Sequence, residues 1–306
     1  MAFSGRKPLT RRDFLRATAG TLAVAGLAGC TESTPETDAE PASEPASEPV
    51  LAAASVPVGV QLFCFRHLLE EDFAGTLAQV ATLGYDGVEF AGYYDHTGDE
   101  LRQMLAGHGL QCAGTHIGID VLLGDELQKS IDFHGALGNT NLIVAGISDE
   151  RTATKDAVLR TAEEFSEIQE KLRPHGMRTG YHCHAYSFNK LLDGETVWDL
   201  LANNTPDDFI LQLDTGNAAH GGADIPEVIK GHPGKIRSMH VKPYTAGAEE
   251  PFEPFIGDDG LPWEEIFTLS ESVGGIEWYV VEYEQESHPP LEALKANREK
   301  VRGFGR

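Results

Sequence analysis

Basic side chains are scarce in this sequence, which has 24 Lys and Arg residues against 48 Asp and Glu residues and a formal net charge of −24. The first 29 residues hold five of the basic side chains and one acidic one, so the remaining chain has 19 basic and 47 acidic side chains, a formal charge of −28. Proteins bind phosphate backbones mainly through Lys and Arg, so this deficit argues against nucleic acid as a partner and predicts a strongly acidic surface.

Cysteine is also rare, with four residues in the whole chain. Apart from Cys30 near the N-terminus, these are Cys64, Cys112 and Cys183, an odd number without close spacing. Such a set does not form a disulfide framework. Each of the three lies in an apolar, strand-like segment, so we expect buried thiols.

The uncharged stretch near the N-terminus, residues 17–29, is only 13 residues long, whereas a membrane-spanning helix needs about 20 apolar residues. The segment 11–15, Arg-Arg-Asp-Phe-Leu, resembles a twin-arginine export signal, and the segment 27–30, Leu-Ala-Gly-Cys, resembles a lipobox. Residues 1–30 are therefore expected to direct export and to leave a lipid on Cys30. That lipid would anchor the chain at the outer face of the cytoplasmic membrane, as its only membrane contact. The alternative is an ordinary cleaved signal with an incidental cysteine.

Residues 31–55 are dominated by Pro, Ser, Glu and Ala, with almost no apolar side chain before Leu51. A segment of this composition does not bury enough apolar surface to offset its loss of conformational entropy, so we expect a disordered tether. The folded domain is then expected at 56–306, a usual size for one α/β barrel.

Short apolar runs alternate with segments of helical periodicity throughout this domain. Eight such pairs predict a parallel sheet with right-handed crossovers that closes into a single (β/α)8 TIM barrel. A doubly wound open sheet would usually carry a Gly-rich phosphate turn after an early strand, and the sequence has none. Strands are expected at 58–63, 87–90, 112–116, 141–144, 177–182, 209–214, 236–240 and 278–282, and helices at about 71–83, 99–106, 125–137, 152–173, 195–202, 225–230, 263–272 and 290–301.

Polar side chains end most of the expected strands, at the end of the barrel where TIM-barrel active sites lie. Residues two apart on a strand face the same side, so His182 is expected beside His184, and His240 beside Lys242. A single histidine at such a position is more often a hydrogen-bonded rim residue, but four polar ends on the last four strands favour a shared cation. Imidazole and carboxylate ligands suit Zn, Mn, Fe, Co or Ni. The polar ends are Glu89, His116, His182, His184, Asp214, His240, Lys242, Glu282 and Glu284.

The segments GVQLF, GYDGVEF, GTHIG, YHCHAYSF, LQLDTGNAAHGG, MHVKPY and WYVVEYEQ resemble the xylose-isomerase-like barrel superfamily, the sugar phosphate isomerase/epimerase group. The resemblance covers essentially all of 56–306. It implies one divalent metal (Mn, Zn, Co or Fe) held by His182, Asp214, His240 and Glu282. Many relatives have Glu in place of His182 and use it with the strand-eight Glu as an acid–base pair, so this chain departs from a two-glutamate mechanism.

The same resemblance implies an isomerase or epimerase that removes a proton next to the carbonyl of a sugar or keto-sugar. Glu282 is the expected general base, because it borders the metal and faces the substrate carbon. The candidates for a second proton carrier are Glu89, His116 and His184, in that order. Lys242 is expected to orient or polarise a substrate oxygen.

The loop at 251–263 is rich in Gly, Pro and aromatic residues. Phe255 and Trp263 are candidates for stacking on the C–H face of a sugar, and the alternative is that they seal the barrel rim. Asp258 and Asp259 in the same loop argue against a phosphorylated substrate.

Three alternative functions stay open at this point. A lyase or hydratase acting on a 3-keto-glycoside or a related keto-sugar fits a site with one catalytic glutamate. A non-catalytic sugar-binding lipoprotein is disfavoured, because such proteins usually have two lobes and the eightfold pattern leaves no second lobe. A nuclease branch of the superfamily needs more metal ligands and a basic face, which the charge argues against.

Overall fold

The computed structural model describes residues 55–306 of this chain. The expected signal segment, with Cys30, and the expected tether up to residue 54 lie outside the described residues and stay predictions. Within the described part, no helix is both long enough and apolar enough to cross a membrane.

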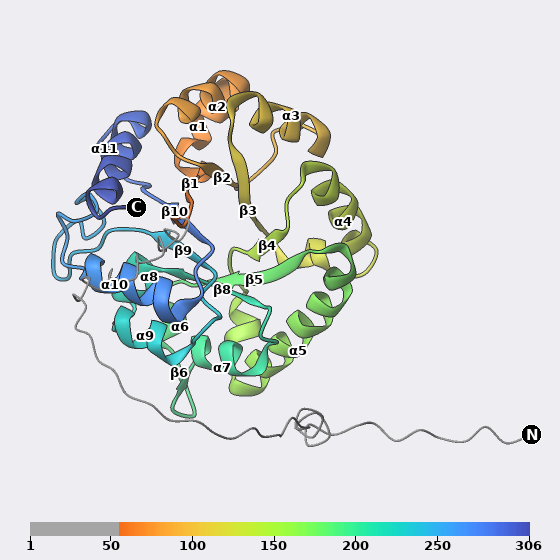
Figure 1. Ribbon diagram of the computed structural model, residues 1–306. Coiled ribbons are helices and arrows are strands. Elements are labelled where there is room, and N and C mark those ends of the chain that lie inside the picture. Colours follow the sequence, from red (N-terminus) through yellow and green to blue (C-terminus); the bar gives the residue numbers. More distant parts are fainter. Residues whose placement is uncertain (1–54) are drawn as a thin grey trace, which may run out of the picture. The chain divides into compact units, whose positions relative to one another are not determined.

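Eight parallel strands close into a barrel, which confirms the predicted fold (Figure 1). Around the barrel the order is β1-β10-β9-β8-β5-β4-β3-β2, so sequential strands of the barrel are neighbours in space. The strands are β1 Val58–Gln61, β2 Gly87–Phe90, β3 Gln111–Ile117, β4 Asn141–Val144, β5 Arg178–His182, β8 Ile210–Asp214, β9 Ser238–Val241 and β10 Trp278–Val281.

A ring of helices surrounds the barrel (Figure 1). The helices expected from the sequence are α2 Phe73–Thr82, α3 Gly98–His108, α4 Glu126–Leu137, α5 Lys155–Leu172, α7 Val197–Asn204, α9 Ile225–Gly231, α10 Trp263–Leu269 and α11 Pro290–Gly303. The short elements that sequence periodicity did not predict are α1 Arg66–Glu71, α6 Tyr186–Asn189, α8 Thr215–His220 and the two-stranded hairpin of β6 Leu191–Leu192 and β7 Glu195–Thr196.

Local sequence explains where the helices begin and end, as α3 illustrates. The hydroxyl of Thr97 accepts a hydrogen bond from the backbone N–H of Glu100, and the Glu100 carboxylate accepts the backbone N–H of Thr97 in return. This capping box satisfies N–H groups that the first helical turn leaves unpaired. The helix stops at Gly109, which adopts a left-handed conformation (φ 69°) that glycine tolerates without strain.

The apolar core lies between the barrel and its helices. On α5, Phe165, Ile168 and Leu172 are fully buried, and the Phe165 ring packs against Phe209 with centroids 5.1 Å apart. Cys64 and Cys183 are buried free thiols, as the sequence predicted, whereas Cys112 is a free thiol that is only partly buried. The barrel interior differs, because many of the side chains that point inward are polar.

At the N-terminal end of the barrel, ion pairs tie three strands together. The carboxylate of Glu277, next to β10, accepts hydrogen bonds from Arg178 on β5 and from Arg237 next to β9, at 2.8 Å each. In TIM barrels this end serves stability and the opposite end carries the chemistry. The ion pairs therefore hold strand ends remote from the candidate site.

Gly180 allows β5 to pack closely against its neighbours in the barrel. A Cβ built on Gly180 would lie 2.5 Å from the carbonyl oxygen of Ile210, 2.7 Å from the Ile210 Cβ and 2.8 Å from the Ile143 Cδ1. Real Cβ atoms do not approach backbone this closely, so any larger residue would push β5 away from β8. That displacement would also move His182, two residues further along β5.

We therefore expect Gly180→Ala to lower the free energy of unfolding by about 1–3 kcal/mol, the usual cost of overpacking a rigid core. Urea denaturation measures the change. The control is Gly107→Ala, since Gly107 is an exposed residue of α3 with open space around an added Cβ. The control variant should be more stable by about 0.5–1 kcal/mol, because alanine favours helix over glycine. Equal effects of the two substitutions would contradict the close contact in β5.

Candidate active site and metal centre

A cavity of about 500 Å³ opens at the C-terminal ends of the barrel strands. Five of the site residues expected from the sequence line it: His116, His182, His184, Lys242 and Glu282. Their positions follow from the two-residue period of strands, which turns alternate side chains toward the barrel axis. This is the end of the fold where TIM-barrel active sites lie.

Four of the expected side chains come together in one group. His182 ends β5, Asp214 ends β8, His240 lies in β9, and Glu282 directly follows β10. Each offers one ligand atom, and these atoms all lie within 4.8 Å of one another. All four residues are buried. The structure thus brings the four side chains from the last four barrel strands close together, and the shared cation stays a prediction.

Asp214 gives the strongest indication of what this group holds. Its Oδ1 accepts the backbone N–H of Asn217 at 2.7 Å and so caps helix α8. Its Oδ2 is buried and has no hydrogen-bond partner within residues 55–306. The nearest nitrogens that face this oxygen are His182 Nε2 and His240 Nδ1, each 3.8 Å away.

A buried carboxylate oxygen without a partner is costly, and a cation at this point would satisfy it. A metal bound at about 2.1 Å from each ligand places ligand atoms about 3.0–3.4 Å apart. The 3.8 Å spacings around Asp214 Oδ2 need only a small contraction to reach that range. Two imidazole nitrogens with two carboxylate oxygens form a donor set that Zn, Mn, Fe and Co accept. The group could therefore hold one divalent metal.

Two basic side chains of the protein, Lys242 and His240, face the carboxylates of this group. Lys242 Nζ lies 3.3 Å from Glu282 Oε2 and also contacts the carboxylate of Glu284. Despite burial, Lys242 and His240 hold the pKa of Glu282 well below its ordinary value. Burial raises the pKa of Asp214 to about 7, while Lys242 acts in the opposite direction. Burial opposes protonation of His240, but the carboxylates of Glu89 and Glu282 raise the pKa of its imidazole to about 10.

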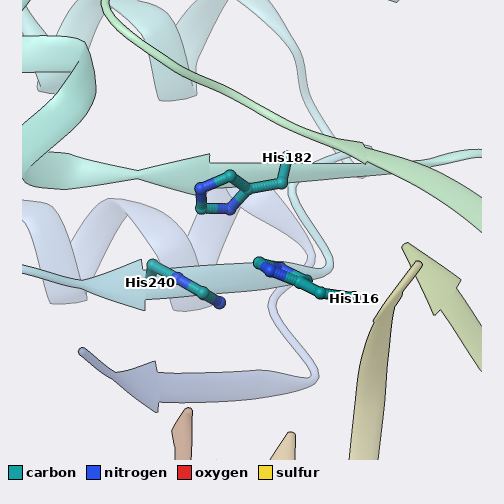
Figure 2. A group of neighbouring side chains, drawn as sticks. All are labelled: His116, His182 and His240. Atoms are coloured by element: carbon teal, nitrogen blue, oxygen red, sulfur yellow. The ribbon is translucent and has the colours of Figure 1, made fainter. Parts of the chain in front are cut away.

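Three imidazoles gather beside this group, as Figure 2 shows for His116, His182 and His240. The rings of His116 and His240 are stacked with centroids 5.0 Å apart, and the His182 ring lies 4.7 Å and 4.5 Å from them. The three residues come from β3, β5 and β9. Only closure of the barrel brings these strands around one axis.

Glu89 lies within the barrel, in contact with the imidazoles of His116 and His240. Its Oε2 accepts hydrogen bonds from Gln61 Nε2 at 2.7 Å and from His240 Nε2 at 2.6 Å, and its Oε1 accepts one from Gln212 Nε2 at 2.7 Å. Burial alone would raise the pKa of Glu89, but His116, His240 and these hydrogen bonds lower it. Glu89 is 1% exposed and does not line the cavity. The expectation that Glu89 carries protons for the substrate stays a prediction, which its absence from the cavity lining does not favour.

Sequence reasoning missed three residues of the site. Gln61 and Gln212 are fully buried and bind Glu89. The available signal was a single polar residue inside each of the apolar runs GVQLF and ILQLD. Phe63 follows β1, is 41% exposed and lines the cavity, so it presents an aromatic face there.

The two aromatic residues that we expected at the substrate do not line the cavity. Trp263 is 2% exposed, its indole N–H donates to Asp259 Oδ1 at 2.7 Å, and its ring stacks on Phe267. Phe255 packs against Tyr283 with ring centroids 5.5 Å apart. Both residues fit the alternative of sealing the barrel rim.

The acidic residues of the same loop are likewise engaged elsewhere. Asp259 bonds the indole of Trp263, and Asp258 forms an ion pair with Lys300 on α11. Neither lines the cavity, so they do not bear on whether a substrate carries phosphate. The acidic residues that do line the cavity are Glu282 and Glu284.

Comparison with known proteins agrees with this fold. A family model described as "Xylose isomerase-like TIM barrel" matches residues 77–303. No curated protein sequence matches the chain significantly.

Several solved structures are similar to this one. A sugar phosphate isomerase/epimerase from Parabacteroides distasonis ATCC 8503 has 21% identity and a TM-score of 0.70, with 86% of this chain and 100% of that chain covered. An L-ribulose 3-epimerase has 17% identity and a TM-score of 0.61, with 82% and 94% covered. The IOLI protein with a zinc atom has 14% identity and a TM-score of 0.62, with 81% and 97% covered. At these identities the likeness shows the fold.

A metal held by this group would depend on the Asp214 carboxylate. We expect Asp214→Asn to lose bound divalent metal, because the amide keeps the shape and the helix cap but removes the anionic Oδ2. Elemental analysis after dialysis against a chelator measures the metal content per chain. The control is Asp207→Asn, which changes a fully exposed aspartate. A full equivalent of tightly held metal in Asp214→Asn would show that Asp214 is not a ligand.

Proposed function

Because the chain belongs to the xylose isomerase-like TIM barrel family, we propose that it is a metal-dependent isomerase or epimerase of a sugar or keto-sugar. The observation that carries the proposal is the unpartnered Oδ2 of Asp214, which lies among two imidazoles and a second carboxylate next to the cavity. Support from outside the chain comes from structural neighbours named as sugar isomerases or epimerases. A neighbour of the same fold that contains zinc supports the metal.

The metal would be held by His182, Asp214, His240 and Glu282, whose ligand atoms lie within 4.8 Å of one another. When bound, it supplies a Lewis acid that stabilises negative charge on the carbonyl and hydroxyl oxygens of the substrate. The apolar packing around the barrel keeps these four side chains in place. The site therefore needs little rearrangement before substrate enters.

Glu282 is suited to remove the proton next to the carbonyl. Its Oε2 is engaged by His240 Nδ1 at 3.0 Å and by Lys242 Nζ at 3.3 Å. Its Oε1 has no hydrogen-bond partner among the described residues, and the side chain lines the cavity. One oxygen thus remains free to take a proton from a substrate carbon.

A second group must return the proton, either to the other face of the same carbon or to the neighbouring carbon. Glu89 does not line the cavity, whereas His116 and His184 both do. His116 Nε2 is bonded to Gln212, and His116 Nδ1 has no bond to any part of the chain that the structure describes. His184 is held in its place by stacking on Tyr186, with ring centroids 5.8 Å apart. We assign the second proton transfer to His116 and the binding of substrate hydroxyls to His184.

Lys242 and Phe63 would orient the sugar. Two contacts of Lys242 Nζ go to Glu282 and Glu284, and an ammonium group has three donors, so one N–H is left for a substrate oxygen. The exposed ring of Phe63 offers an apolar face to the C–H groups of a sugar. Together they place a polar and an apolar contact on the lining of one cavity.

The proposal predicts exchange of a carbon-bound proton with solvent. In D2O, the metal-loaded protein should convert a free sugar or keto-sugar into an isomer that carries deuterium next to the carbonyl, detected by mass spectrometry and NMR. Glu282→Gln should lower kcat by about 10²–10⁴-fold, the usual worth of a positioned proton carrier. Glu265→Gln, an exposed surface change on α10, should leave kcat unchanged.

Product mass separates the alternatives. Loss of water or of an aglycone from a keto-glycoside would replace the isomerase proposal by a lyase or hydratase. Saturable sugar binding without exchange or turnover, for every metal tested, would indicate a binding protein. Near-normal turnover by Glu282→Gln would exclude Glu282 as the base.

A further inference from the structure

A buried glutamine lies between two of the three imidazoles. The Oε1 of Gln212 is 2.6 Å from His116 Nε2 and 2.9 Å from His182 Nδ1. An amide oxygen only accepts hydrogen bonds. Both imidazole nitrogens must therefore carry a hydrogen and donate it to the same oxygen.

The orientation of this amide is fixed by its other end. Gln212 Nε2 donates to Glu89 Oε1 at 2.7 Å and to Ser238 Oγ at 2.9 Å. A flipped amide would place its oxygen against the Glu89 carboxylate, which offers no hydrogen. Glu89 is itself held by Gln61 Nε2 at 2.7 Å and His240 Nε2 at 2.6 Å. These connected hydrogen bonds allow only one orientation of the Gln212 amide, with Nε2 as the donor and Oε1 as the acceptor.

From this arrangement we infer that Gln212 is a positioning residue that fixes the ring tautomers of His116 and His182. A hydrogen on His182 Nδ1 leaves the lone pair on Nε2, which faces Asp214 Oδ2 at 3.8 Å within the ligand group. A hydrogen on His116 Nε2 leaves the lone pair on Nδ1, on a ring that lines the cavity. One amide oxygen thus prepares one histidine to bind a metal and the other to accept a proton.

The same imidazoles lie close enough to hold an ion among themselves, and the hydrogen bonds argue against that use. His116 Nε2 and His182 Nδ1 donate to Gln212, and His240 Nε2 donates to Glu89. A nitrogen that carries a hydrogen has no lone pair for a metal. An ion that used these three nitrogens would have to break all of these bonds, so the bonded nitrogens are left to orient the rings.

The role of His116 as proton carrier rests on the proposed function, whereas the tautomers do not. They follow from hydrogen bonds of the protein alone and are measurable without substrate. Failure of the tautomer assignment and failure of the proposed function are therefore distinguishable outcomes.

The test compares Gln212→Met with Gln212→Glu. Methionine has a similar length and removes both the acceptor and the donor. Glutamic acid keeps one carboxyl oxygen as an acceptor for the two imidazoles. Its other oxygen, when protonated, donates to Glu89 in place of the amide nitrogen. The control is Gln169→Met, because Gln169 is also fully buried and bonds Asp208 and the backbone of Thr179, remote from the cavity.

The first readout is the tautomer of each ring, from two-bond ¹H–¹⁵N spectra of the full chain labelled in histidine and free of metal. We expect hydrogen on His182 Nδ1 and on His116 Nε2 in the unmodified chain, in Gln212→Glu and in Gln169→Met, and mixed tautomers in Gln212→Met. The second readout is the Kd for Zn²⁺ from competition with a chelator. It should rise about 10–100-fold in Gln212→Met alone, as for other partners that orient a metal-binding histidine.

Two outcomes would overturn the inference. One is hydrogen on His182 Nε2 or on His116 Nδ1 in the unmodified chain. This measurement does not depend on whether any variant folds. The other is a folded Gln212→Met with unchanged tautomers and unchanged Kd. A protein with the expected tautomers and Zn²⁺ affinity that turns over no sugar would instead count against the proposed function.

Discussion

The buried carboxylate of Asp214 is the group on which the active end of this protein depends. One of its oxygens caps helix α8 and thereby fixes the side chain, while the other is enclosed without a hydrogen-bond partner in the described chain. A fold does not leave a charge in this state unless something else satisfies it. His182, His240 and Glu282 lie close to that carboxylate, and a cation held by the four residues, as proposed, would offset the cost of burying it. Asp214 is the last residue of β8 and caps α8, which begins at the next residue, so the same side chain holds two elements of the fold and belongs to the proposed ligand group.

The barrel supplies the rigidity that this arrangement needs. Parallel strands with a period of two present every second residue to one axis, so separate segments of the chain converge without long loops. Next to the ligands, Glu89, Gln61 and Gln212 form a closed set of hydrogen bonds in which every buried donor meets an acceptor. Such networks give ligands a definite orientation as well as a position. The site is thus built from polar residues within the barrel, whereas the stability of the fold comes from the apolar layer outside it.

Most of the fold followed from the sequence, since strands such as 87–90 and 141–144 are short, mostly apolar runs between helical segments and lie where periodicity placed them. The four proposed ligands were also predictable, because His, Asp and Glu at strand ends are not explained by packing. The sequence pattern does not indicate how deeply each polar side chain lies within the barrel. Glu89 lies near the end of β2 just as His240 lies near the end of β9, yet it pairs in register with Gln61 and lies among the buried hydrogen bonds. The sequence pattern also did not distinguish Phe63, which lines the cavity, from Trp263, which does not.

The claim that one cation satisfies Asp214 together with His182, His240 and Glu282 is tested most directly by crystals grown with Mn²⁺ or Zn²⁺ and measured at the absorption edge of the metal. The expected result is a single anomalous peak about 2.0–2.2 Å from His182 Nε2, Asp214 Oδ2, His240 Nδ1 and an oxygen of Glu282. A peak elsewhere, or a well-defined structure in which Asp214 Oδ2 bonds a protein group and no metal, would contradict it.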